Sequence, residues 1–564
     1  MRKTFLGMLL ALLLLTGCTP VPSGNNPGTE PPDDHLTADY TGWAASPFTT
    51  MQFNVDSLIC NNPSIETVPG RVTITEAGTY LLSGKLENAQ LVVDAPSGTV
   101  CLVLDGVSMN CERGPAILIR GCDCAALVLA EDTVSTITDG RSYLIGGNTA
   151  AEDAAICSNS DLVLTGSGSL AVEGNYSAAV SGRRSIAVTG GEYSFTAQKN
   201  GLCGREELLL CDGTLSVVCG GDAIVAAGAG NAGTVCITGG KYELTAGSDG
   251  IRAAGELQIG EGSIHITSGG GSANACWGDT AESWGLWGGL PAEAPAGPDG
   301  EPAEENGSVL HTEKTAAALW GGSVAISGGT LRLDSSDDAI SSESSIAVSG
   351  GDLRILSGND GIFAAGCLAV SGGTITVKES FCGISSGSLH QSGGTVTVAG
   401  HAQGIGIAGG ADHLAREYPG AGSFAPEITG TVELSGGSLS VRAGDAGISS
   451  PGDIRITKGT MVVESDAMAL QCTGSVVLTG GTALLLGSQP GDYTLALTSQ
   501  GVVDCTHYGN SGDELRIATP LALLWQSKCS CGFSKLLFST PGMAEQKSVT
   551  ITTPVMKQTI SLKE

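Results

Sequence analysis

The chain has 564 residues, 85 of them glycine, and a formal net charge of −30 at pH 7. This excess of carboxylates argues against nucleic acid as a partner, because phosphate backbones attract surfaces rich in Lys and Arg. Hydrophobic residues make up 41% of the chain, which is enough for a large core and assigns the glycines to turns rather than to disorder. We therefore expect one elongated folded domain.

The N-terminus has the pattern of a bacterial export signal. Arg2 and Lys3 precede an apolar run over residues 6–15, as in a secretory signal peptide. The sequence LTGC, which ends at Cys18, resembles the lipobox of lipoproteins. We predict that residues 1–18 are a lipoprotein signal peptide and that acylated Cys18 anchors an extracytoplasmic, surface-exposed protein to the cell membrane. The alternative is a plain secretory peptide.

The rest of the chain divides by composition and periodicity. Residues 19–47 are rich in Pro, Gly, Asn and acidic residues, which indicates a flexible tether. Residues 48–150 hold alternating apolar runs at irregular spacing, as expected of an N-terminal cap and irregular coils. Residues 151–486 carry a regular repeat with a large insertion at 269–319, and residues 487–564 have the pattern of a β-rich C-terminal cap.

The repeat predicts the fold class. Gly-Gly pairs begin at Gly328, Gly350, Gly372 and Gly393, a period of about 22 residues. Short alternating apolar runs between them are typical of strands, and none has the spacing of a helix. A propeller blade needs roughly 40 residues, whereas about 22 are sufficient for one coil of a parallel β-helix. Since parallel crossovers are almost always right-handed, we predict an all-β chain, a right-handed parallel β-helix solenoid with about 22 residues per coil.

Acidic turns precede the repeated small–Ile pair in several coils. One period places Asp338 and Asp360 about 5 Å apart on adjacent coils, where two carboxylates repel unless a cation lies between them. Calcium accepts about six to eight oxygen ligands with tolerant geometry. We predict calcium binding by some of these residues: Asp222, Asp249, Asp337, Asp338 and Asp360. The alternative is that each Asp only hydrogen-bonds its own turn.

Two further groups could contact carbohydrate. Arg332 and Arg354 are one period apart, and alternation turns both outward, where guanidinium groups suit the carboxylates of a uronate chain. The alternative for them is an ordinary solvated face. The second group is four Trp side chains in or beside the insertion, which offer flat faces to sugar rings or pin the insertion onto the coils: Trp277, Trp284, Trp287 and Trp320.

The 18 cysteines are distributed along the repeat. Several, including Cys101, Cys211, Cys236 and Cys367, occupy strand positions at which Val or Ile stands in other repeats. A buried free Cys packs as a small hydrophobe, so we expect packing to be the main role of these residues. Disulfides and a metal cluster are the alternatives.

Short motifs along the chain occur in an order that resembles a known family. The run from Thr79 to Leu86 is followed by VLDGV at residues 103–107, DLVLTGSG at residues 161–168, and the acidic turns. This order resembles a family of secreted bacterial carbohydrate-binding β-helix proteins related in fold to pectate lyases, over most of residues 70–560. The resemblance implies binding of cellulose-like or polygalacturonate-like polymers, and bound calcium.

The sequence thus predicts a lipoprotein that binds an acidic or cellulose-like polysaccharide with support from calcium and without catalysis. A calcium-dependent polysaccharide lyase is the first alternative, and it needs a Lys or Arg base beside the metal. Arg332, Arg354 and Lys378 are the basic residues near the acidic turns of the repeat. The second alternative is an adhesin whose repeats are a spacer for protein contacts.

Overall fold

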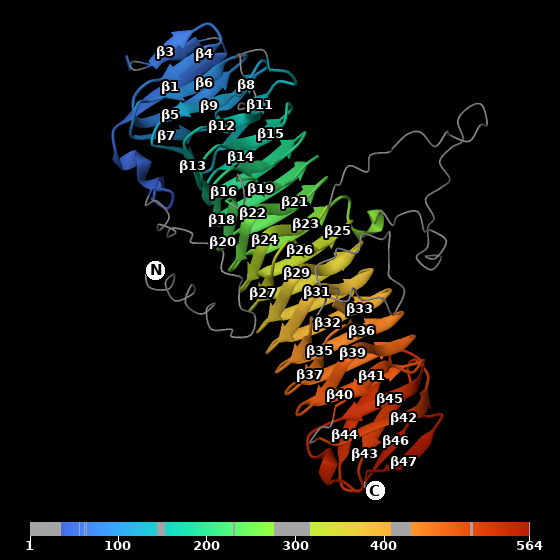
Figure 1. The fold of residues 1–564 in the computed structure, drawn as a ribbon. Coiled ribbons are helices and arrows are strands. Elements are labelled where there is room, and N and C mark those ends of the chain that lie inside the picture. The colour runs from blue at the N-terminus through green and yellow to red at the C-terminus, as the bar shows by residue number, and fades with distance from the viewer. Residues whose placement is uncertain are drawn as a thin grey trace, which may run out of the picture.

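The computed structural model describes residues 35–562 except for 56, 61, 64, 144–152, 229–231, 276–315, 408–429 and 497–499. It is an elongated stack of strands, with the first strands at one end and the C-terminus at the other (Figure 1). The strands form three rows along the long axis, and within each row successive strands pair in parallel. Each row therefore presents equivalent residues of successive levels next to one another.

Most strands lie entirely within one of the three rows. Row 1 contains β7 (Thr99–Leu104), β10 (Cys124–Leu129), β13 (Asp161–Gly166), β20 (Thr234–Ile237), β27 (Ile346–Val348), β34 (Val432–Leu434), β37 (Ile454–Ile456) and β41 (Asp492–Leu495). Row 2 contains β8 (Ser108–Cys111), β11 (Val134–Asp139), β14 (Ser169–Gly174), β21 (Lys241–Ala246), β23 (Ser263–Ser268), β25 (Thr330–Ser335), β28 (Asp352–Ser357), β30 (Thr374–Glu379), β32 (Thr395–Gly400), β35 (Ser438–Ala443), β38 (Thr460–Ser465) and β40 (Thr482–Gly487). Row 3 contains β4 (Arg71–Ile74), β6 (Gln90–Asp94), β9 (Ile117–Gly121), β12 (Ala154–Ser158), β15 (Ala178–Gly182), β17 (Leu202–Gly204), β19 (Ile224–Ala226), β26 (Ile340–Ser342), β33 (Gln403–Ile407) and β36 (Ala446–Ser450).

Longer strands bend from one row into the next and join the rows. Rows 1 and 2 share β5 (Gly78–Leu86), β16 (Ile186–Ala197) and β18 (Glu207–Cys219), and rows 3 and 1 share β22 (Ile251–Ile259), β24 (Leu319–Ile326), β29 (Asp360–Val370), β31 (Cys382–Gln391) and β39 (Met468–Leu478). Register shifts mark the bends, as between Ala364 and Cys367 in β29.

These bent strands correct the predicted fold class. The chain is all-β, as predicted, but the predicted right-handed β-helix solenoid is wrong. Only the period of about 22 residues is confirmed, as the spacing between register partners such as Ile340 and Ile362. All strands of the described residues except β43, β44, β46 and β47 belong to one continuous sheet of 43 strands. This sheet closes around a single core in a barrel-like tube. Antiparallel strands are added at both ends. The prediction failed because the repeat period marks strand positions and turns, but contains no signal for strands that continue from one row into the next.

Inward-facing side chains of successive levels form the core. In row 3 the register partners Ile340, Ile362 and Ile384 are all 0% exposed. In row 2, β25 alternates exposed or half-buried with buried residues, as the period-two pattern predicts. Burial of each such aliphatic side chain contributes roughly 1.5–3 kcal/mol, so the repeat stabilises the sheet at every level.

At the N-terminal end, β1 (Phe48–Val55) pairs in antiparallel fashion with β2 (Ser57–Ile59), and β3 (Ile65–Val68) does so with β4. The 3-10 helix η2 (Thr41–Ala45) precedes β1, and the ring of its Trp43 meets the Phe48 ring of β1 edge-on. Side chains of residues 36–43, including Leu36 and Trp43, pack on the outward face of row 1 against Cys101 and Val103. This segment therefore covers an apolar patch that would otherwise face solvent.

At the C-terminal end, β42 (Val502–Gly509) and β45 (Phe533–Ser539) extend the main sheet in antiparallel fashion. A second sheet contains β43 (Glu514–Ala518), β44 (Leu523–Lys528), β46 (Ser548–Thr552) and β47 (Lys557–Ser561). The 3-10 turn η5 (Met543–Glu545) precedes β46, whereas the 3-10 turn η3 (Ser272–Asn274) follows β23 in the middle of the chain. Leu515, Phe538 and Ile551 belong to a second core between the two sheets.

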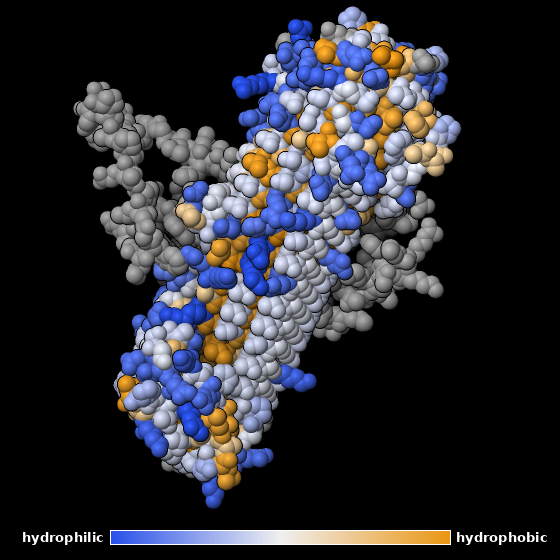
Figure 2. All heavy atoms as spheres, turned by 180° about the vertical axis from the view of Figure 1, so that it is seen from behind, coloured by the Kyte–Doolittle hydropathy of each residue, from blue (hydrophilic) through white to orange (hydrophobic). Residues whose placement is uncertain are grey.

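Outward-facing side chains form columns along the long axis, and Figure 2 shows a hydrophobic column beside paler ones. The cysteines of the described residues carry no disulfide bond, and several are buried in the strands. This agrees with packing as their main role. Within the described ranges, no helix has the length and apolar character needed to cross a membrane.

Candidate functional site

The turns that lead into the strands of row 3 carry a column of short polar side chains, one on each turn. We call this column the acidic edge: Asn200, Asp222, Asp249, Asp338 and Asp360. The side-chain oxygen of one level accepts a backbone N–H from the next. Asn200 Oδ1 accepts from Asp222 at 3.0 Å, Asp222 Oδ1 from Asp249 at 3.1 Å, and Asp338 Oδ1 from Asp360 at 3.0 Å. The side chains thus satisfy buried backbone donors of the neighbouring turn.

Asp222 and Asp249 share one guanidinium group. Arg252 Nη1 lies 3.7 Å from Asp222 Oδ2, and Arg252 Nε lies 3.9 Å from Asp249 Oδ2. The guanidinium carbon lies 5.1 Å from the centre of the Trp320 ring, on the neighbouring strand. A cation over an indole ring is attracted by the ring quadrupole. Arg252 therefore holds the ring and the two carboxylates in one arrangement.

The carboxyl group of Asp249 has a raised pKa. Burial raises the pKa of Asp249 to about 7, and repulsion from Asp222 adds to the effect. The N–H of Ala317, which donates to Asp249 Oδ1 at 3.0 Å, and the charge of Arg252 oppose it. The Asp249 carboxyl therefore exchanges its proton near neutral pH.

The second part of the acidic edge contains Asp338, Asn359 and Asp360. Asp338 Oδ1 also accepts from Asn359 Nδ2 at 3.1 Å. Asn359 Oδ1 is buried and has no hydrogen-bond donor among the residues that the structure describes. Asp337, half-buried beside Asp338, adds to the repulsion that raises the pKa of Asp249.

These oxygens are of the kind that calcium binds, and their number is small. Carboxylate and amide oxygens are typical calcium ligands, together with backbone carbonyls and water. Throughout the described part of the chain, no set of three or more His, Cys, Asp or Glu side chains is arranged to hold a metal ion. The donor types therefore fit calcium, but backbone and water oxygens would have to supply much of its coordination.

The predicted arginines lie on a different row. Arg332 on β25 and Arg354 on β28 are register partners in row 2, and both are exposed. Arg354 Nη2 forms an ion pair with Asp352 Oδ2 at 3.1 Å, and His265 precedes Arg332 in the same column. The structure therefore gathers these basic residues with one another and not with the acidic edge.

Four of the other predicted positions lie outside the described residues: Cys18, Trp277, Trp284 and Trp287. Sequence reasoning missed Arg252, which the structure places at the centre of the site. Its signal was weak but present, because it follows Asp249 by three residues on an outward strand position. Its contact with Trp320 depends on the return of the chain after the insertion.

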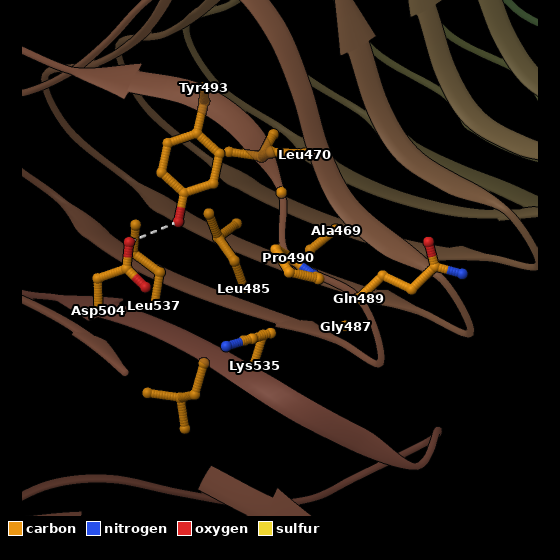
Figure 3. Close-up of a pocket in the computed structure, with 12 residues that line it drawn as sticks. Ala469, Leu470, Leu485, Gly487, Gln489, Pro490, Tyr493, Asp504, Lys535 and Leu537 are labelled. Atoms are coloured by element: carbon orange, nitrogen blue, oxygen red, sulfur yellow. Dashed lines mark hydrogen bonds between the residues drawn. The ribbon is translucent and has the colours of Figure 1, made fainter. Parts of the chain in front are cut away.

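A cavity of about 190 Å³ lies apart from this site, among β39, β40, β41, β42 and β45 (Figure 3). Tyr493 donates its O–H to Asp504 Oδ2 at 2.8 Å, and Lys535 Nζ donates to Thr506 Oγ1 at 2.8 Å. None of the residues selected from the sequence lines it. Its charged groups are bonded within the protein, so the acidic edge is the stronger candidate.

Comparison with known proteins gives one family model that matches this chain, one relative and one solved structure. A family model described as a carbohydrate-binding domain-containing protein matches residues 69–361, slightly more than half of the chain. A carbohydrate-binding domain-containing protein of Acetivibrio thermocellus is 27% identical over 161 residues, which are 28% of this chain and 52% of that protein. The chain thus spans about half the length of this relative. The solved structure of a polysaccharide lyase-like protein from C. thermocellum, a gadolinium derivative, is 26% identical with a TM-score of 0.38, over 40% of this chain and 92% of that chain. The whole acidic edge, Arg252 and Trp320 lie within the matched residues 69–361.

Proposed function

This chain belongs to the family of carbohydrate-binding domain-containing proteins, and from this premise we propose that it binds polysaccharide at Trp320, Arg252 and the neighbouring carboxylates. The observation that carries the proposal is the half-buried Trp320 ring, fixed by Arg252 beside Asp222 and Asp249. Sugars present apolar C–H faces to aromatic rings and hydroxyl groups to carboxylates, so an aromatic face next to placed polar groups suits them.

The chemistry of Arg252 favours binding over cleavage. A polysaccharide lyase needs a base that removes a proton from the sugar. Arg252 stays protonated, since guanidinium groups do not lose their proton in proteins, and two carboxylates hold that charge. The proposal is therefore a binding protein without catalysis.

Calcium is part of this proposal at Asp338, Asn359 and Asp360. The buried Asn359 Oδ1 and the adjacent carboxylates support it. Bound calcium would supply positive charge to this part of the acidic edge. A location at the cell surface is also included in the proposal. It is supported by the lipobox-like sequence that ends at Cys18, because acylation of Cys18 would tether the protein to the membrane.

The test is binding of the full chain to a panel of neutral and acidic polysaccharides, with calcium or with chelator. Ultraviolet absorbance is recorded for unsaturated products. We expect binding without new absorbance, and weaker binding in chelator. Trp320→Ala should weaken binding roughly tenfold, whereas the control Tyr508→Ala, at an exposed ring in the C-terminal part, should not. Growing absorbance would favour the lyase, and absence of binding to every polysaccharide would favour the adhesin.

A further inference from the structure

Two tyrosine rings stack on the surface near one end of the acidic edge. Tyr143 follows β11, and Tyr176 lies in the turn between β14 and β15. Their ring centroids are 4.1 Å apart and the planes differ by 19°. Tyr176 is 38% exposed, which is high for a large ring in contact with another ring. The pair therefore presents an aromatic surface to solvent.

A buried carboxylate holds this pair in place. Tyr143 donates its O–H to Asp139 Oδ2 at 2.6 Å, and the backbone N–H of Asn175 donates to Asp139 Oδ1. Asn175 Nδ2 also donates to the backbone oxygen of Asp139 at 3.0 Å. Asp139 is 3% exposed. One side chain thus fixes both the Tyr143 ring and the turn that carries Tyr176, so the stacked surface exists before any ligand binds.

The turn of Tyr176 belongs to the same stack of turns as the acidic edge. Backbone hydrogen bonds connect the successive turns at 2.8, 2.7 and 3.1 Å: Lys199 to Ser177, Gly221 to Lys199, and Ser248 to Gly221. The paired strands β15, β17, β19, β22 and β24 continue this order as far as Trp320. Four strand spacings of ~4.8 Å place the levels of Tyr176 and Trp320 roughly 19 Å apart along the long axis.

We propose that the Tyr143–Tyr176 pair is a second sugar-stacking position, and that one uncharged polysaccharide chain lies along the long axis over this pair and Trp320. This inference rests on the proposed function and adds the direction and class of the ligand. Between the two aromatic positions lie Asp222 and Asp249 with the guanidinium of Arg252, and the exposed Lys199 lies on the turn next to that of Tyr176. Beside Trp320, a chain of uronates would meet repulsion from the Asp222 carboxylate, whereas the hydroxyl groups of an uncharged chain would find an acceptor there.

The experiment compares Tyr176→Ala and Trp320→Ala in the full chain, with Tyr508→Ala as the control. Affinity electrophoresis in soluble neutral and uronate polysaccharides measures binding, and thermal unfolding checks the fold. We expect Tyr176→Ala to weaken binding of the neutral polymer roughly two- to tenfold, with an unchanged melting temperature. The neutral polymer should also protect Tyr176 from chemical nitration.

The outcomes separate this inference from the proposed function. If Trp320→Ala weakens binding while Tyr176→Ala binds like the wild type and nitration is not slowed, the second position is wrong and the proposed function stands. Tighter binding of the uronate polymer than of the neutral one would overturn the uncharged class. If the wild type binds no polysaccharide, the proposed function itself fails.

Discussion

The carboxyl group of Asp249 makes stability depend on pH in a direction that the site dictates. Its folded-state pKa of about 7 lies above the ordinary value of 3.8 because of burial and repulsion from Asp222. The folded state therefore holds this proton more tightly than the unfolded state. The contribution of the protonated Asp249 carboxyl to the free energy of unfolding is greatest at low pH, and it is lost as the pH rises from about 4 to about 7.

Asp249→Asn should remove this dependence with little change in shape. The amide oxygen can still accept the N–H of Ala317, as Asp249 Oδ1 does. One pKa unit corresponds to about 1.4 kcal/mol, so a shift of about three units costs the folded state about 4 kcal/mol at pH 8. At pH 5 the cost is about 2 kcal/mol. We therefore expect the variant to gain roughly 2–3 kcal/mol relative to the wild type between pH 5 and pH 8.

The assay is equilibrium urea unfolding at both pH values, followed by tryptophan fluorescence. The control is Glu173→Gln, at an exposed position of β14. Burial also raises the pKa of Asp139 and of Glu207, so only the difference between wild type and variant isolates Asp249. If wild type and Asp249→Asn lost stability equally between pH 5 and pH 8, the electrostatic account of this site would be refuted.

Three more outcomes follow from the structure. Arg252→Gln should destabilise the protein by about 1–3 kcal/mol at pH 8, because two buried carboxylates lose their shared cation, and the change in the surroundings of Trp320 should shift the fluorescence spectrum; an unchanged spectrum would contradict the contact. Gly383→Ala should cost about 1–3 kcal/mol, since a Cβ atom there would overlap Val398 Cγ1. The control is Gly42→Ala, where no heavy atom lies within 4 Å of the added carbon. Saturating calcium should raise the melting temperature by an amount that grows with its concentration, corresponding to about 2.7 kcal/mol at a hundred times the dissociation constant; equal melting curves with calcium and with chelator would argue against a calcium site.

The sequence was informative where one period places residues on neighbouring strands. Residues 22 apart, such as Ile340 and Ile362, are register partners, and so are Arg332 and Arg354. Inward positions were predictable because alternation within each strand marks one buried face. These relations depend only on local spacing, which a repeat states directly.

Other features depend on contacts that spacing does not encode. The closed sheet depends on strands such as β16 and β29, which bend at register shifts and join two rows. Arg252 meets Trp320 although 68 residues separate them, because the chain returns to the next level after the insertion. The Asp139 contacts that place Tyr143 beside Tyr176 likewise join turns that are far apart in the sequence.

The charge of the acidic edge is not required by the fold. Asn200 performs the same structural role as Asp222, since each accepts the backbone N–H of the next level with its Oδ1 atom. An amide does this without repulsion, whereas the carboxylates of Asp222 and Asp249 repel each other and raise the pKa of Asp249. A carboxylate at these levels therefore costs stability that asparagine would save. A destabilising carboxylate is expected at a position where it contacts a ligand. Asp222→Asn should therefore preserve or increase the free energy of unfolding and weaken polysaccharide binding. A variant with unchanged binding would show that the charge has no role in the site.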